Sequence, residues 1–316
     1  MAQCVRRLVL APTLWLVALL LCTSSAPVAV KEDNLTETQK SNTLRVLQAF
    51  GRAILGRTVK AHFCSVEVRV LLPLVGVLMD SVDYAGSLPE MLRAVDYTNV
   101  VITQLDFSAK GQRLSGTVPA SWSSMTSLVS LWLEGCERVT GTLPASWSSM
   151  TSLTDLNLHG TQVSGSLRPQ WSSMTSLATL SLRLTKISGS LPSEWSSMTS
   201  LTLLDLQGTK VSGSLPSEWS GMKSAEVLQL QHGDLSGSLP SSWSAMPKLR
   251  EVLLSGNHFC GCVPESWTLK RKLMVTIEAD HEGRGAPHRW SLRRVERTAR
   301  AAAVCMAVLL SVGLAA

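Results

Sequence analysis

The chain has 316 residues, of which 45% are hydrophobic, 5% aromatic and 16% charged, which excludes a globally disordered protein. The net charge of +6 comes mostly from the C-terminal end, because residues 270–316 hold nine basic and four acidic side chains. Residues 115–269 hold eight basic and ten acidic side chains, so we expect no nucleic-acid partner.

Residues 1–26 are predicted to be a secretory signal peptide. Arg6 and Arg7 precede an apolar stretch from Leu8 to Cys22, and small residues lead up to Ala26. The mature N-terminus is expected between residues 24 and 30. Export would make Asn34, in the only N-x-Ser/Thr sequon, a candidate glycosylation site. An unused sequon is the other interpretation.

Residues 31–100 are predicted to form an N-terminal cap region that contains a helix. Ser41 or Asn42 is the expected N-cap. Five apolar residues would share one helical stripe: Leu44, Leu47, Phe50, Ile54 and Leu55. Such an amphipathic helix can cover the open end of a stacked array.

Residues 101–280 contain a repeat with a period of 24 residues. Seven tryptophans recur at this interval, with one interval of 25: Trp122, Trp147, Trp171, Trp195, Trp219, Trp243 and Trp267. One unit, L-x-x-L-x-L-x-x-T-x-V from Leu153, fits the leucine-rich repeat pattern. The stretch from Leu273 to Glu278 follows Trp267 at the same distance in sequence at which Leu249 follows Trp243, and this spacing predicts a further strand.

The fold class is therefore predicted to be a leucine-rich-repeat solenoid, a curved α/β-type horseshoe. Each unit would place a short parallel strand on the concave face and stack its leucines on neighbouring units. We expect V-S-G-S-L-P to turn the chain, and P-x-x-W-S-S-M to form an irregular or 3-10 convex side with tryptophan in the core. Cys136, at the ninth position of its unit, is expected to hydrogen-bond inside the turn as an inert thiol.

Side chains between and after the strand leucines should point outward and form three columns on the concave face. The first column is Gln104, Ser130, Asp155, Thr179, Leu203, Val227 and Glu251. The second is Asp106, Trp132, Asn157, Ser181, Asp205, Gln229 and Leu253. The third is Ser108, Glu134, His159, Arg183, Gln207, Gln231 and Ser255. The predicted binding face comprises Trp132, Asp155, Asn157, His159, Arg183, Asp205, Gln207, Gln229 and Gln231, with Trp132 as an aromatic anchor. A solvated face with one chance tryptophan is the competing interpretation.

The sequence contains no pattern that predicts catalysis or a cofactor. His258, Cys260, Cys262 and His281 match no common zinc spacing. The glycines lack the spacing of a phosphate-binding loop. We expect a protein without enzymatic activity, cofactor or metal.

The C-terminal end consists of a basic linker, residues 281–300, and an apolar tail, residues 301–316. The tail is shorter than the ~20 residues of a spanning helix. Retention would leave the basic linker outside the cell, against the usual charge rule. Replacement by a GPI anchor answers both objections. Simple secretion and a retained tail are the alternatives.

The repeat, together with its flanks, resembles the promastigote surface antigen family of Leishmania and related trypanosomatids. The flanking matches are N-T-L-R-V-L-Q-A-F from Asn42, H-F-C-S from His62, G-S-L-P-E-M from Gly86, V-D-Y from Val95 and G-N-H-F-C-G-C-V-P-E-S-W from Gly256. The resemblance covers about residues 40–280. It implies an exported cell-surface or secreted protein that attaches to host cells. It also implies that Cys64, Cys260 and Cys262 lack their family partners, because the expected cysteines are missing. The Thr/Pro-rich stalk that the family carries before its anchor is absent as well.

Two function classes follow from these observations. The chain is predicted to be a surface recognition or adhesion protein that binds a host-cell protein or glycan. The alternative is a passive coat component that shields the membrane without a specific ligand.

Overall fold

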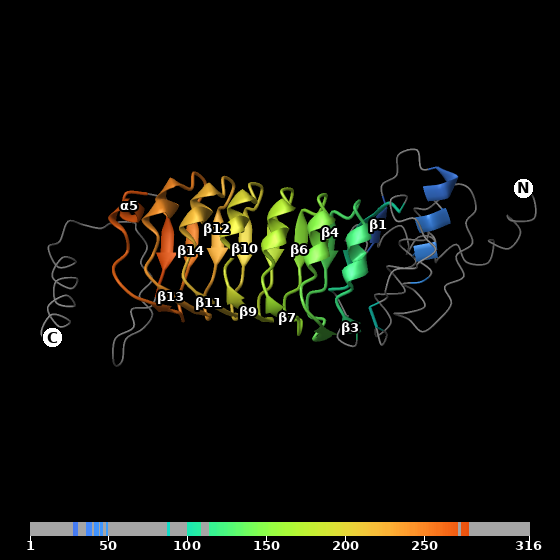
Figure 1. Cartoon of the computed structure of the whole chain (residues 1–316), viewed down its shortest axis with the longest axis horizontal. Coiled ribbons are helices and arrows are strands. Elements are labelled where there is room, and N and C mark those ends of the chain that lie inside the picture. Colours follow the sequence, from blue (N-terminus) through green and yellow to red (C-terminus); the bar gives the residue numbers. More distant parts are fainter. Residues whose placement is uncertain are drawn as a thin grey trace, which may run out of the picture.

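The computed structural model describes residues 28–30, 36–39, 41–43, 45–46, 49, 87–88, 100–108, 114–270 and 273–277. Within them the chain winds into a solenoid whose successive coils stack along one axis (Figure 1). The predicted signal peptide and C-terminal tail, Asn34 and Cys64 lie outside the described residues, as does the predicted helical stripe from Leu44 to Leu55.

Each coil contributes one parallel strand to a nine-stranded sheet that β1 completes at one edge, in the order β1-β2-β4-β6-β8-β10-β12-β14-β16. Its strands are β1 (Val28–Val30), β2 (Ile102–Asp106), β4 (Ser130–Trp132), β6 (Asp155–Asn157), β8 (Thr179–Ser181), β10 (Leu203–Asp205), β12 (Val227–Gln229), β14 (Glu251–Leu253) and β16 (Met274–Thr276). Strands β2 to β16 are parallel, and the repeat period fixes their register. The further strand predicted after Trp267 is confirmed as β16.

Strand β1 was not predicted, and it pairs antiparallel with β2. It thereby occupies the edge of the sheet that the first coil would otherwise leave open. An unpaired edge presents free backbone N–H and C=O groups, so this strand blunts a site of intermolecular pairing.

The V-S-G-S part of the segment predicted to turn the chain also forms a second set of parallel strands, which the sequence did not predict. The strands are β7 (Ser164–Ser166), β9 (Lys186–Ser190), β11 (Lys210–Gly213), β13 (Asp234–Gly237) and β15 (His258–Phe259), with β3 (Ser115–Thr117) and β5 (Arg138–Thr140) paired separately. Stacking at a constant pitch brings equivalent backbone groups of neighbouring coils together, and pairing satisfies them.

The predicted 3-10 side is confirmed. Six units carry a 3-10 turn: η2 (Ala120–Ser124), η3 (Ala145–Ser149), η4 (Pro169–Ser173), η5 (Ser193–Ser197), η6 (Ser217–Gly221) and η7 (Ser241–Ala245). The last unit forms a short α-helix, α5 (Glu265–Thr268). Serine hydroxyls link these turns, since Ser173 Oγ donates to the carbonyl of Ser148 and Ser197 Oγ to that of Ser172.

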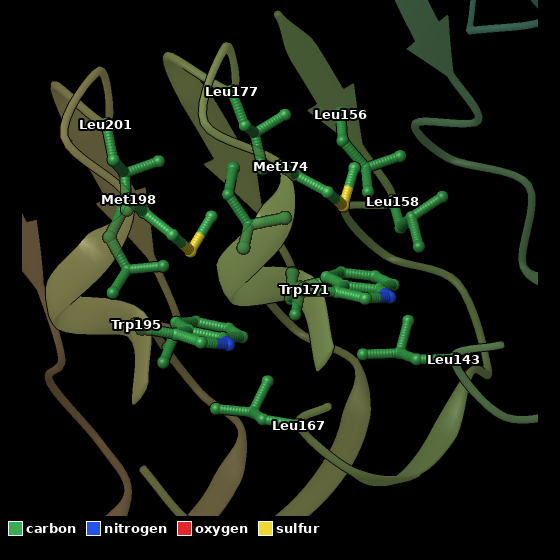
Figure 2. Packing of buried hydrophobic residues seen from close by; sticks show 14 of the residues in the cluster. Leu143, Leu156, Leu158, Leu167, Trp171, Met174, Leu177, Trp195, Met198 and Leu201 are labelled. Carbon is green, nitrogen blue, oxygen red and sulfur yellow. The ribbon is translucent and has the colours of Figure 1, made fainter. Parts of the chain in front are cut away.

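The tryptophan column is buried as predicted, and all seven side chains have 0% exposure. Figure 2 shows Trp171 and Trp195 one coil apart, each with a methionine, Met174 or Met198, beside it. The six indoles from Trp147 to Trp267 also donate a hydrogen bond to a carbonyl of the preceding coil, as Trp219 Nε1 does to that of Pro192 at 2.8 Å. The sequence predicted the packing but not this bond, which pairs the polar indole N–H inside the core.

The N-terminal helix begins earlier than predicted. Residues 37–39, 41–43, 45–46 and 49 are helical, so Ser41 and Asn42 are not N-caps. The Gln39 backbone N–H donates to Thr36 Oγ1, and the Thr36 N–H donates to the side-chain oxygen of Gln39. This reciprocal pair is a capping box. Val46 joins the solenoid core, which agrees with a helix that covers the first coil.

Candidate functional site

The nine residues predicted to form a binding face lie on the outer side of the nine-stranded sheet, which we call the concave face. Strand register places Trp132 beside Asn157, and Ser181 beside Asp205. Asp205 in turn lies beside Gln229, as the second column predicts. The third column follows the strand ends, where the backbone N–H groups of Leu184 and Gly208 bond to the carbonyls of Gln207 and Gln231.

A hydrogen-bonded network joins Glu134, Asn157 and His159 on two neighbouring coils. Asn157 Nδ2 donates to Glu134 Oε2 at 2.9 Å, and His159 Nδ1 lies 3.2 Å from Glu134 Oε1. The Asn157 side-chain oxygen accepts the backbone N–H of His159 at 3.0 Å. These bonds fix two candidate side chains, Asn157 and His159, together with Glu134, near the half-buried Trp132, so this end of the face is pre-organised.

Asp205, in the middle of the face, is buried, although the sequence predicted an exposed position. Its side chain is 7% exposed, and its Oδ1 accepts the backbone N–H of Gln207 at 3.0 Å. Burial raises the pKa of the Asp205 carboxyl above its ordinary value, and the hydrogen bond from Gln207, followed by the charges of Arg183 and His159, offsets part of that rise.

Two buried polar atoms of the face have no hydrogen-bond partner among the described residues. They are Arg183 Nε and Gln231 Oε1, both in the third column. Gln231 is 8% exposed, again contrary to the predicted exposure. A buried donor or acceptor without a partner lowers the stability of the fold by about 1–3 kcal/mol, so folded proteins rarely contain one.

The residues that follow these two are also exceptional. Leu184 and His232 have left-handed backbones, with φ of 54° and 59°, where other coils carry glycine. Such a conformation costs a non-glycine residue ~1–3 kcal/mol. Both side chains are exposed and lean over the glycine of the next coil, Gly208 or Gly256. The break in the glycine column was visible in the sequence, but its link to the unpaired atoms was not.

Cys136 was predicted to form a hydrogen bond inside its own turn, but its contact lies on the preceding coil. Its Sγ lies 3.7 Å from the carbonyl oxygen of Phe107 on the preceding coil. Burial, with a smaller effect of the Asp106 charge, raises the pKa of the Cys136 thiol to about 12, which agrees with an inert thiol.

The cysteines of the last coil differ from each other. Cys260 is free and exposed, whereas Cys262 is disulfide-bonded, so the expectation that Cys262 lacks a partner is wrong. In the described part of the chain, no three His, Cys, Asp or Glu side chains are grouped to hold a metal ion. None of the helices found there is long and apolar enough to span a membrane.

Comparison with known proteins confirms the resemblance to Leishmania surface antigens. Over 142 residues the chain is 58% identical to "Surface membrane glycoprotein GP46/M-2" of Leishmania amazonensis. That alignment covers 43% of this chain and 30% of the relative, so the chain matches only part of the relative's length. No protein-family model matches the chain.

Solved structures confirm the leucine-rich-repeat fold. The Arabidopsis receptor kinase HAESA, solved with the peptide hormone IDA and the co-receptor SERK1, has a TM-score of 0.55 at 25% identity, over 63% of this chain and 33% of that chain. The PEPR1–AtPEP1 structure has a TM-score of 0.54 at 27% identity, over 61% and 27%. A plant ice-binding protein shares the fold alone, with a TM-score of 0.54 at 20% identity, over 76% and 72%.

Proposed function

We propose that this chain is a non-enzymatic surface protein that recognises a host molecule through its concave face. One observation carries the proposal: side chains vary along the face while the core repeats. The buried tryptophan column is invariant over seven coils, whereas the second column changes from Trp132 through Asn157 and Ser181 to Asp205. A rigid frame with a varied face is the usual arrangement of a repeat protein that binds a ligand.

The relatives support this function class. The Leishmania amazonensis relative is named a surface membrane glycoprotein, and the HAESA and PEPR1 structures contain ligands on the same fold. We extend to this chain a cell-surface or secreted location and recognition of a macromolecule. Signal-peptide removal, glycosylation of Asn34 and a GPI anchor are further parts of the proposal, and their residues lie outside the described ones.

The experiment is an attachment assay with the purified, fluorescently labelled full chain and cultured host cells. We expect saturable attachment that an excess of unlabelled protein displaces. Trp132→Ala should weaken attachment without altering the unfolding transition, whereas Gln170→Ala on the opposite side should have no effect. Attachment that never saturates, or that is unchanged by Trp132→Ala and by Asn157→Ala, would favour a passive coat component.

A further inference from the structure

Two independent irregularities coincide on the coils of β8 and β12. Arg183 and Gln231 carry the two buried polar atoms that lack partners within the described chain. The residues directly after them, Leu184 and His232, are its two non-glycine residues with left-handed backbones. Stability would favour glycine at both backbone positions and apolar groups in place of both atoms. The coincidence points to a ligand that pairs these atoms.

The charge of the concave face indicates what that ligand carries. Its three columns hold five carboxylates and one guanidinium, a net charge of −4 with neutral histidine, on a chain whose net charge is +6. The carboxylates are Asp106, Glu134, Asp155, Asp205 and Glu251. A cationic ligand is therefore attracted to this face, and an anionic one, such as a sulfated glycan, is repelled.

The positions of the unpaired atoms indicate an extended ligand. Strands β8 and β12 are separated by one strand, β10, so their coils lie about 10 Å apart at ~4.8 Å per strand. Three residues of an extended peptide also span about 10 Å. Both atoms are buried, so the ends of the two side chains must turn outward before a ligand carbonyl can accept from Arg183 Nε and a ligand N–H can donate to Gln231 Oε1.

The local charge does not oppose this placement. Arg183 lies near Asp205, and its charge helps to hold the Asp205 carboxylate in the ionised form. A ligand carbonyl that accepts from Arg183 therefore lies beside two opposite charges that offset each other. Basic side chains of the ligand can reach the carboxylates of Asp155 and Glu251 in the first column. The exposed side chain of Leu184, 52% accessible, offers an apolar contact at the edge.

We propose that the concave face from β6 to β14 binds an extended basic peptide segment, whose backbone pairs with Arg183 and Gln231 and whose Lys or Arg side chains face Asp155 and Glu251 on the two outer coils. This inference rests on the proposed recognition function and names its ligand class. A neutral glycan could also offer hydroxyl groups to both atoms, but it would gain nothing from the acidic columns.

The test measures fluorescence anisotropy of a labelled hexapeptide of alternating Lys and Ala with the full chain. A Glu/Ala hexapeptide and a neutral dextran oligosaccharide serve as the other ligand classes. We expect binding of the Lys peptide alone, weakened several-fold between low and physiological salt. Gln231→Met should weaken binding about fivefold to tenfold while the unfolding midpoint stays equal or rises, because an unpaired buried acceptor is removed.

Gln170→Met, on the opposite side of the solenoid, is the matched control and should change neither quantity. If Gln231→Met unfolds the protein, Asp155→Asn decides instead, with an expected twofold to fivefold loss against no loss for Glu194→Gln. Any of four results overturns the proposal. They are equal binding of both peptides, binding of dextran alone, no binding at all, and unchanged peptide affinity in the face variant that decides the test. Saturable attachment to host cells that excess Lys peptide does not displace would reject the peptide while recognition itself stands.

Discussion

The side-chain amide of Asn257 makes a hydrogen bond that Gly233, one coil earlier, cannot make. Thr161, Thr185 and Thr209 occupy the same ladder position, and each hydroxyl donates to the carbonyl three residues before it. Gly233 has no hydroxyl for the carbonyl of Leu230. Asn257 Nδ2 donates to that carbonyl at 2.7 Å instead, and Asn257 Oδ1 accepts the N–H of Leu235 at 3.1 Å.

Asn257→Thr should therefore lower the free energy of unfolding by about 1–3 kcal/mol, since it leaves buried groups of the preceding coil unpaired. The measurement is chemical unfolding followed by tryptophan fluorescence. Adding Gly233→Thr restores a hydroxyl at the ladder position, so the double variant should be more stable than the sum of the two single changes predicts. Strictly additive effects of the two substitutions would contradict the inference that Asn257 compensates for the missing hydroxyl at Gly233.

Trp195 and Trp132 should respond oppositely to truncation. Trp195 is fully buried and its Nε1 donates to the carbonyl of Arg168 at 2.9 Å, so Trp195→Ala should destabilise by roughly 3–5 kcal/mol. Trp132 is half-buried on the concave face, and Trp132→Ala should cost under about 1 kcal/mol. Thermal unfolding of both variants tests this. A larger loss of stability in Trp132→Ala than in Trp195→Ala would show that the two side chains are assigned to the wrong sides of the coil.

Asp205→Asn should stabilise the protein at neutral pH. Because burial raises the carboxyl's pKa, the folded protein holds this proton more tightly than the unfolded chain does. The resulting penalty grows as the pH rises from the ordinary value of 3.8 through the folded pKa, and it is absent below 3.8. Asparagine keeps an oxygen for the Gln207 N–H. Unfolding measured from pH 3 to 8 should show a gain that disappears in acid, whereas the exposed Glu194→Gln should show none.

Cys260 and Cys136 should differ in reactivity towards iodoacetamide in the native protein. Cys260 is exposed, whereas Cys136 is buried with a thiol pKa of about 12. At pH 8 we expect modification of Cys260 within minutes and of Cys136 only after unfolding, as mapped by mass spectrometry of peptides. Rapid native labelling of Cys136 would show that the first coils open.

The C-terminal tail gives a prediction that rests on sequence alone. Phosphatidylinositol-specific phospholipase C should release the mature protein from expressing cells, and residues 301–316 should be missing from the released chain. The same cells treated with heat-inactivated enzyme are the control. Detection of Val304 to Leu314 in the mature protein would eliminate the anchor.

The sequence by itself determined the periodic features of this protein. A 24-residue interval requires every coil to place equivalent residues in equivalent surroundings, so the buried tryptophans, the strand register and the three face columns could be assigned from spacing. The outward position of Trp132 followed from the same alternation. These assignments hold because they average over many equivalent coils.

Only the tertiary structure decided the exceptions. The bond from Asn257 to Leu230, the burial of Asp205 and Gln231, and the contact of Leu184 with Gly208 each depend on which side chain the neighbouring coil presents. The second row of strands also arises from pairing between coils. Such contacts join residues more than 20 positions apart, and their geometry is set by packing rather than by the local pattern.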